Sequence, residues 1–278
     1  MRTFKKSPFG VSIRAIKVKK DFPDKNFSDV IPLEILLNIY LNGNNIATIS
    51  CSPGNLTELA VGYLINSGFI SGYSDINLLR LCGQEVSEAV KKKDHVLKIE
   101  VSVNPDKLPS GRIAGETKQY VSSACGSLDR FFLRTDLRKI KDGAIFDSSA
   151  IFNLNPLALA SQNEKKQIGG LHNAAMFGPD SRLMYMAEDI GRHNCIDKIA
   201  GFMSINKLDP SNKIVFTTGR ISLDVVYKAM VMAIPVFVSN SSVTYSAAML
   251  GKKIGLTLIG YARGQRYNIY SCPERIKF

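Results

Sequence analysis

The pattern of apolar and polar positions divides the chain into a strand-rich first part and a second part in which strands and helices alternate. Residues 32–41 and 45–51 read as two strands around a hairpin turn, and residues 95–103 alternate apolar with polar side chains. Residues 56–64 carry an apolar face at helical spacing, so we expect one helix to pack on these strands. The residues before this lobe are basic and contain only a short alternating run, at 11–15.

The second part is predicted to hold a hairpin followed by strand–helix units. Residues 171–177 and 182–187 flank a turn, and a helix is expected to begin at Asn155-Pro156, because proline is favoured at the first helical position. The later units comprise strands at 214–217, 236–239 and 256–259, with helices at 222–232 and 243–252. Such alternation is typical of an α/β layer, so the protein is expected to be α/β, or α+β overall.

Three regions are therefore expected along the chain. These are a strand-rich N-terminal lobe over 1–110, a mobile cysteine-bearing loop over 111–130, and an α/β domain over 131–278. Chains of 278 residues with 22% charged side chains are typical of ordinary globular proteins with a sizeable core. The formal net charge of +12 predicts attraction to anions. Because the basic residues are scattered and no nucleic-acid-binding pattern is present, we expect no nucleic-acid partner. No apolar run is long enough to span a bilayer, so we expect no membrane partner and no signal peptide.

The chain has five cysteines, none in a CxxC spacing, which favours free thiols in a reducing compartment, the cytoplasm. Cys125 lies among small and polar residues after a loop that contains several glycines. A thiol in such a loop is a candidate nucleophile or carrier, although an incidental loop cysteine would look the same. Cys51 and Cys82, in or beside apolar runs, are expected to be buried.

Polar, glycine-containing clusters follow or precede the predicted strands of the second part. The clusters are Gly169–His172, Glu188–Lys198, Thr217–Arg220 and Gly260–Arg266. Glycine lets the backbone approach a ligand and arginine grips phosphate, so together they suggest a site for a bulky phosphorylated ligand at one sheet edge. The second cluster has an alternative interpretation, as helix caps and salt bridges.

Taken in order, these segments resemble the formate dehydrogenase accessory sulfurtransferase family, also called FdhD. The resemblance runs collinearly from about residue 32 to 276. It rests on the segments Pro32–Ile35, Ser52–Leu64, Gly169–His172 with Ala174-Ala175, Glu188–Asn194, Gly219–Ser222, Gly260–Gly264 and Asn268–Tyr270 with Pro273. It implies a cytidine-deaminase-like fold for the C-terminal domain. It also implies a homodimer that takes persulfide sulfur from a cysteine desulfurase and passes it to the molybdenum or tungsten bis-guanine-dinucleotide cofactor of formate dehydrogenase.

The resemblance also assigns residues. Cys125 matches the persulfide carrier, and the cofactor-binding segment consists of Tyr261, Ala262, Arg263, Gly264, Gln265 and Arg266. Possible supporting residues are His172, Asp189, Arg192, His193, Gly219 and Arg220. The family loop commonly has a second cysteine, where this chain has Leu128, and a glutamate after its first helix, where this chain has Ser67. A persulfide needs one sulfur only, so the carrier role survives.

Several alternatives stay open at this point. Arg192, His193 or Arg220 would favour a thiolate at Cys125, but His193 would also suit a structural role, and Asp189 would either orient it or cap the helix. No metal is expected, because a zinc deaminase needs a CxxC-type ligand pair. A Cys–His hydrolase would need an oxyanion hole to which the sequence does not point. The main rival is a non-catalytic chaperone that only binds and delivers the cofactor.

Overall fold

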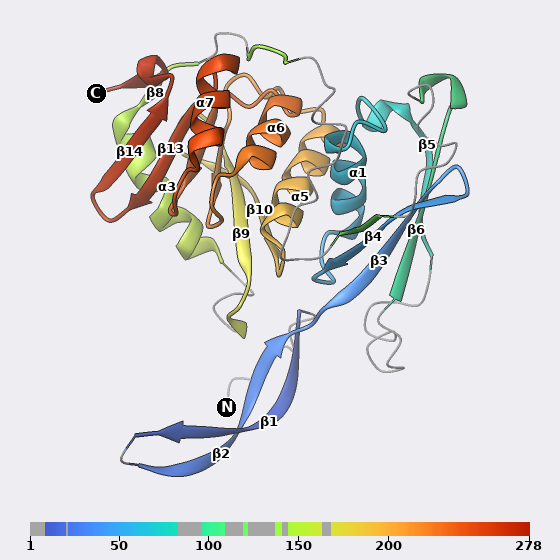
Figure 1. Ribbon diagram of the computed structural model, residues 1–278, viewed down its shortest axis with the longest axis vertical. Helices are drawn as coiled ribbons and strands as arrows, with labels where there is room; N and C mark the ends of the chain where they lie inside the picture. The colour runs from blue at the N-terminus through green and yellow to red at the C-terminus, as the bar shows by residue number, and fades with distance from the viewer. Residues whose placement is uncertain are drawn as a thin grey trace.

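The computed structural model describes residues 9–20, 22–82, 96–108, 119–121, 137–140, 144–162 and 168–278, with the backbone alone at 22–24 and 119–121. It shows a mixed α/β protein in which two main sheets lie side by side (Figure 1). The predicted boundary positions, 110 and 130, fall outside the described ranges, so the division into three regions stays a prediction.

The N-terminal sheet has five strands in the order β5-β6-β3-β4-β7. Its elements are β3 (Ile35–Leu41), β4 (Asn44–Cys51), β5 (Ile76–Cys82), β6 (Val96–Val103) and β7 (Gln119–Val121), with short 3-10 turns at Tyr73–Asp75 and Pro105–Lys107. Helix α1 (Leu56–Asn66) packs on one face, where alternate strand residues such as Leu37, Ile39 and Ile99 are fully buried. The strands and the helix predicted from the apolar spacing are therefore confirmed.

The second sheet has six strands in the order β10-β9-β11-β12-β13-β14. The strands are β9 (His172–Phe177), β10 (Leu183–Asp189), β11 (Ile214–Thr217), β12 (Val236–Ser239), β13 (Thr257–Arg263) and β14 (Arg266–Ser271). The helices are α3 (Ser148–Ser161), α5 (Arg192–Ile205), α6 (Leu223–Val231) and α7 (Tyr245–Ile254). Strands β8 (Phe146–Asp147) and β15 (Ile276–Lys277) form a small separate pair, and Pro273–Arg275 is a 3-10 turn. The predicted hairpin and strand–helix alternation are confirmed.

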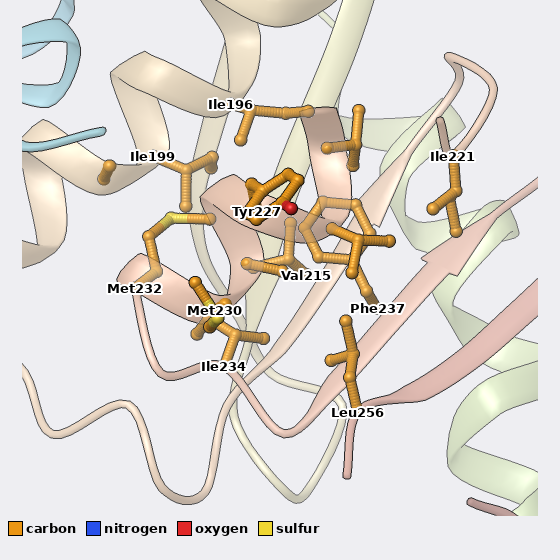
Figure 2. Close-up of a cluster of buried hydrophobic side chains, with 14 of the residues drawn as sticks. Ile196, Ile199, Val215, Ile221, Tyr227, Met230, Met232, Ile234, Phe237 and Leu256 are labelled. Carbon is orange, nitrogen blue, oxygen red and sulfur yellow. The ribbon is translucent and has the colours of Figure 1, made fainter. Parts of the chain in front are cut away.

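Two apolar layers cover the faces of this sheet. On one face, Ile196 and Ile199 of α5 and Tyr227 of α6 meet Val215 and Phe237 of the central strands (Figure 2). On the other face, α3 buries a second cluster that includes Phe146, Phe177 and Phe216. The sheet is thus buried on both sides, as parallel strands require, and its polar loops gather at its edges. The predicted similarity of the C-terminal domain to the cytidine deaminase fold stays a prediction.

Helix α3 begins earlier than the sequence suggested. The predicted start at Asn155-Pro156 is wrong, because the helix begins at Ser148 and holds Pro156 inside it. The side chain of Asp147 accepts a hydrogen bond of 2.8 Å from the backbone N–H of Ser149 and so caps the helix. An interior proline costs more than one cap contributes, so the burial of Ile151, Leu154 and Ala158 against the sheet is needed to offset it.

A hairpin arm precedes the N-terminal sheet and was not foreseen beyond its short alternating run. Strands β1 (Gly10–Lys19) and β2 (Phe22–Pro32) pair only with each other and extend away from the body (Figure 1). The base of the arm is anchored, because the Phe9 ring lies against Gly54 and Pro32 lies against Gly170. Ile16 and Val18 on the arm are 64% and 72% exposed. The arm therefore presents apolar side chains to its surroundings.

The two main sheets are joined by a close contact between α1 and α5 (Figure 1). A Cβ atom on Gly62 would lie 1.7 Å from the carbonyl oxygen of Asp197, and one on Gly201 would lie 1.9 Å from that of Glu58. Only glycine lets the two backbones approach so closely. No helix in the described ranges is long and apolar enough to cross a bilayer.

Candidate functional site

Five segments of the six-stranded sheet meet at one edge. Strands β10, β11, β12 and β13 end there and β9 begins there, because β9 runs antiparallel to both of its neighbours while β11, β12 and β13 are parallel. The four clusters singled out in the sequence, Gly169–His172, Glu188–Lys198, Thr217–Arg220 and Gly260–Arg266, all lie at this edge. Their predicted placement at strand ends is confirmed, whereas their roles stay predictions.

Asp189 is a buried hub that ties this edge to the N-terminal lobe. Its carboxylate accepts hydrogen bonds from the Ser52 N–H (3.2 Å), the Gly191 N–H (2.9 Å) and the Asn194 side-chain amide (2.8 Å). It also pairs with the ammonium of Lys198 at 2.6 Å, with both side chains fully buried. Burial alone would lower the pKa of Lys198, but the Asp189 carboxylate outweighs it and the pKa is raised. The carboxylate of Asp189 thus stabilises the N-terminal end of α5 and is not left to bind a ligand.

His193, in the first turn of α5, faces Asp224 in the first turn of α6. Nε2 of His193 lies 3.0 Å from Oδ2 of Asp224, although neither ring nitrogen makes a well-directed hydrogen bond. Burial and, next, the positive charge of Lys228 lower the pKa of His193, Asp224 opposes both, and the resulting pKa is about 3. The imidazole is therefore neutral near pH 7, so Arg192 and Arg220 remain as the cations offered for a thiolate.

Arg192 lies across Gly219, where a Cβ atom would be 2.9 Å from that of Arg192. The loop after β12 supports the same turn, because the Ser239 hydroxyl donates to the Gly219 carbonyl at 2.6 Å and the Ser241 N–H donates to Ser239 Oγ at 2.9 Å. Gly219 is buried, while the side chain of Arg220 is exposed. Arg192 and the Gly219-Arg220 turn thus form one cationic corner, next to the N-terminus of α5.

The predicted cofactor segment is a bulged hairpin between β13 and β14. Tyr261 has a left-handed φ of 54°, and its N–H donates to the Ser241 carbonyl at 2.8 Å. The register shifts between Gly260 and Arg263, which marks a β-bulge, a feature common beside functional sites. Ala262 is buried, whereas Arg263, Gly264, Gln265 and Arg266 are exposed at the tip. Arg263 pairs with Arg266 across the hairpin, so both guanidinium groups are available to an anion.

The edge brings some of the predicted residues together and leaves others apart. Asp189, His172 and the first turn of α5 lie at its β10–β9 end, since Asp189 pairs with His172 in register. The Tyr261–Arg266 hairpin lies four strand positions from β10, about 19 Å away at the usual strand spacing. The Gly219-Arg220 turn lies between them. A ligand that touched all these residues would need the length of a dinucleotide.

The described cysteines are poor carriers. Burial raises the pKa of Cys51 and Cys195 well above the ordinary value, and the nearby Asp189 carboxylate raises it further. Burial likewise raises the pKa of Cys272. Cys82 is only half-buried, not fully buried as predicted, because it lies on the edge strand β5. Cys125, the predicted carrier, and Leu128 lie outside the described residues.

Asp224, Ser52 and the loop 239–242 belong to this edge and were missed in the sequence. The signal for the loop was a run of small polar residues directly after a buried strand. Asp224 and Ser52 gave no such signal, because their contacts with His193 and Asp189 join segments far apart in the chain. In the described ranges, no three histidine, cysteine, aspartate or glutamate side chains gather in a metal-binding arrangement.

Comparisons with known proteins all indicate the same family. The sequence model of the FdhD/NarQ family matches residues 32–277. The chain is 31% identical over 254 residues to a protein named sulfur carrier protein FdhD from Geobacillus kaustophilus (strain HTA426), covering 89% of this chain and 90% of the relative. A protein of the same name from Sulfolobus acidocaldarius is 32% identical over 270 residues, which are 96% of this chain and 99% of that one.

A solved structure shares the fold. It is described as a candidate formate dehydrogenase accessory protein from Desulfotalea psychrophila. The superposition covers 97% of this chain and 100% of that one, with a TM-score of 0.79 and 24% sequence identity.

Proposed function

The chain belongs to the FdhD/NarQ family, and on that premise we propose that it is a sulfur carrier for the maturation of formate dehydrogenase. It takes persulfide sulfur from a cysteine desulfurase on Cys125. It passes this sulfur to the molybdenum or tungsten bis-guanine-dinucleotide cofactor, which is its substrate. The observation that carries the proposal is the edge itself, where Arg192, Arg220 and the Arg263–Arg266 tip offer cations to a long polyanion.

The course of β7 supports Cys125 as the carrier. Strand β7 pairs in parallel with β4, with Val121 opposite Ile49. Beyond Ile49, β4 ends at Cys51, and the N–H of the next residue, Ser52, donates to Asp189 at the candidate edge. Cys125 follows Val121 by four residues, so chain geometry keeps its Cα within about 14 Å of that of Val121. This length of chain is sufficient to bring the thiol to the edge.

Loading of the carrier needs a thiolate. The Cys125 thiolate attacks the outer sulfur of the desulfurase persulfide, a new S–S bond forms, and the desulfurase thiolate leaves. Arg192 and Arg220 supply the positive charge that favours the attacking thiolate. Neutral His193 does not add charge, and its contact with Asp224 fixes the first turn of α5 beside Arg192.

The cofactor would lie along the edge with a phosphate-bearing end at the Tyr261–Arg266 hairpin. We expect guanosine diphosphate to bind there. Arg263→Ala removes a charge-assisted contact of about 1.5–3 kcal/mol, so calorimetry should show a fall in affinity of roughly one to two orders of magnitude. Lys252→Met, an exposed cation on α7, is the control and should bind normally. Unchanged affinity in Arg263→Ala would move the phosphate site elsewhere.

The alternative function is a chaperone that binds and delivers the cofactor without carrying sulfur. The absence of a second loop cysteine, with Leu128 in its place, keeps this candidate open. Formate dehydrogenase activity in cells that lack the native protein separates the two. The carrier proposal predicts that Cys125→Ala fails to restore activity while Cys82→Ala restores it. Full restoration by Cys125→Ala would leave only the chaperone.

The setting of this function follows from the same features. We propose that the protein works in the cytoplasm, where the four cysteines of the described ranges, all free, would stay reduced. We also propose that two copies associate through the β1–β2 arm. An isolated two-stranded hairpin is marginally stable, and this one exposes Ile13, Ile16 and Val18. The C-terminal domain is proposed to share the cytidine deaminase fold.

A further inference from the structure

A hollow of 420 Å³ lies at the edge of the six-stranded sheet opposite to the candidate site. There β9 ends at Phe177, β10 begins at Leu183 and β11 begins at Ile214. The lining residues are Gly178, Pro179, Asp180, Arg182, Leu183, Met184 and Lys213. Strand β11 separates Lys213 from the Thr217–Arg220 turn by about 13 Å. The hollow is therefore a separate place in the fold, and the proposed function does not use it.

Lys213 is the unusual residue of this hollow. It is only 8% exposed, and its ammonium donates a hydrogen bond to the neutral side-chain oxygen of its neighbour Asn212. Across the described residues, no carboxylate lies within ion-pair distance of it. The acid of the same loop, Asp209, accepts hydrogen bonds from the N–H and the hydroxyl of Ser211, at 3.0 and 2.7 Å, and interacts with the charge of Lys213 only from beyond ion-pair distance. Lysine is rarely buried without a counter-charge, because the loss of hydration is costly.

A second cation lines the same hollow. The guanidinium of Arg182 is not paired with a carboxylate within the part of the chain that the structure describes, and its side chain is exposed. The lining acid, Asp180, accepts a hydrogen bond from the backbone N–H of Arg182 at 3.2 Å and stabilises the turn. Among the described residues, the hollow thus carries two cations against one acid, and no carboxylate forms a direct ion pair with the buried cation.

The remaining walls are apolar. Pro179 is exposed, Leu183 is half-buried and Met184 is 38% exposed. A ligand here needs an anionic group for Lys213 and Arg182 and an apolar or flat body for these three side chains. Two cations, one of them a planar fork, suit a doubly charged phosphate better than a singly charged carboxylate.

We propose that this hollow is a second anion site, which binds a small phosphate ester between Lys213 and Arg182, with its apolar body against Pro179, Leu183 and Met184. It is a property of this protein beyond sulfur delivery and does not rest on that proposal. Bound phosphate places a negative charge in direct contact with the ammonium of Lys213, which has no direct ion pair among the described residues.

Calorimetry with the full chain tests this proposal, in a buffer free of phosphate and sulfate. The probes are phenyl phosphate, inorganic phosphate and benzoate. Inorganic phosphate has the phosphate group of phenyl phosphate without its ring, and benzoate has the ring with a carboxylate in place of the phosphate. Phenyl phosphate should bind most tightly, because it alone satisfies both the cations and the apolar wall. Lys213→Met keeps the aliphatic stem and removes the charge, so affinity should fall about tenfold to a hundredfold. Arg182→Gln should weaken binding less, and Lys252→Met should leave it unchanged.

Thermal unfolding shows that the variant is folded. Lys213→Met removes a buried charge that has no direct ion pair among the described residues, so without ligand it should unfold at the same temperature as the natural protein or higher. Phenyl phosphate should raise the unfolding temperature of the natural protein but not that of Lys213→Met. The proposal is overturned if phenyl phosphate does not bind, if benzoate binds as tightly, or if Lys213→Met binds as well as the natural protein. It is also overturned if Arg263→Ala, at the candidate edge, abolishes the binding.

Discussion

At the residue scale, the charged groups of the Glu188–Lys198 stretch divide into two kinds. Asp189, Asn194 and Lys198 are buried and bonded to one another or to the N-terminal lobe, at Ser50 and Ser52. Breaking such a buried pair would leave an uncompensated charge, at a cost of about 3–5 kcal/mol. Arg192 is half-buried in the same turn, across Gly219. The stretch is therefore an internal brace, and a role of Arg192 in an anion site is part of our proposal.

His193 provides a test of this arrangement through the pH dependence of stability. In the unfolded chain its pKa is near 6.5, and in the folded protein burial lowers the pKa to about 3. Between these values the unfolded state binds a proton that the folded state does not. Stability is therefore full above pH 6.5 and falls as the pH falls towards 3. When the pH falls from about 7.5 to about 5.5, protonation of this residue in the unfolded chain should lower the free energy of unfolding, measured with urea, by about 1.4 kcal/mol.

The variant His193→Gln isolates this effect from that of the other histidines. Between the two pH values, the free energy of unfolding of this variant should fall by about 1.4 kcal/mol less than that of the natural protein. An equal loss in both proteins would mean that His193 is already charged or exposed in the folded state.

Sequence reasoning located these residues but did not separate their roles. The sequence left the Glu188–Lys198 stretch as either a binding site or a cap and salt-bridge cluster; the structure shows the second for Asp189, Asn194 and Lys198, and the binding site stays a prediction. What decides between them is burial and partners from distant segments, such as Ser52 for Asp189 and Asp224 for His193. Local spacing carries no information on such contacts.

At the element scale, the α1–α5 contact shows why helices could be predicted but their packing could not. The apolar spacing of each helix follows from its own sequence. The contact depends on Gly62 and Gly201, each of which faces a backbone carbonyl of the other helix. Nothing in the local sequence distinguishes these two glycines from the others, because their role appears only when the two helices pack together. The same holds for α3, where the cap at Asp147 overrode the proline signal at Pro156.

The arm is the element through which we propose that two copies associate. If two copies associate through it, light scattering should give twice the chain mass of 30.6 kDa. The double change Ile16→Thr with Val18→Thr keeps β-branched side chains and removes apolar surface, so it should shift the protein towards the single-chain mass. Leu78→Thr, at a 61% exposed position on β5, is the matched control and should not. A double variant that stays dimeric would place the interface elsewhere.

At the scale of the whole molecule, the proposed sulfur delivery depends on one geometric condition. The N-terminal sheet and the six-stranded sheet must be held so that β7, which leads to Cys125, points to the edge with Arg192 and the Tyr261–Arg266 hairpin. The Asp189 hub and the α1–α5 contact provide this fixed relation. The order of the loops along the edge could be predicted in part from strand–helix alternation. The joint between the sheets could not, because it rests on contacts between segments more than a hundred residues apart.

The most direct test of the central claim is mass spectrometry of the protein after incubation with a cysteine desulfurase and cysteine. Cleavage after Lys118 and Arg130 releases residues 119–130, whose only cysteine is Cys125. The proposal predicts one added sulfur atom on this peptide, lost on reduction, and none on the peptides that hold Cys51, Cys82, Cys195 or Cys272. Cys82→Ala should load sulfur normally. An unmodified 119–130 peptide, with the desulfurase active towards another acceptor, would contradict the sulfur-carrier account.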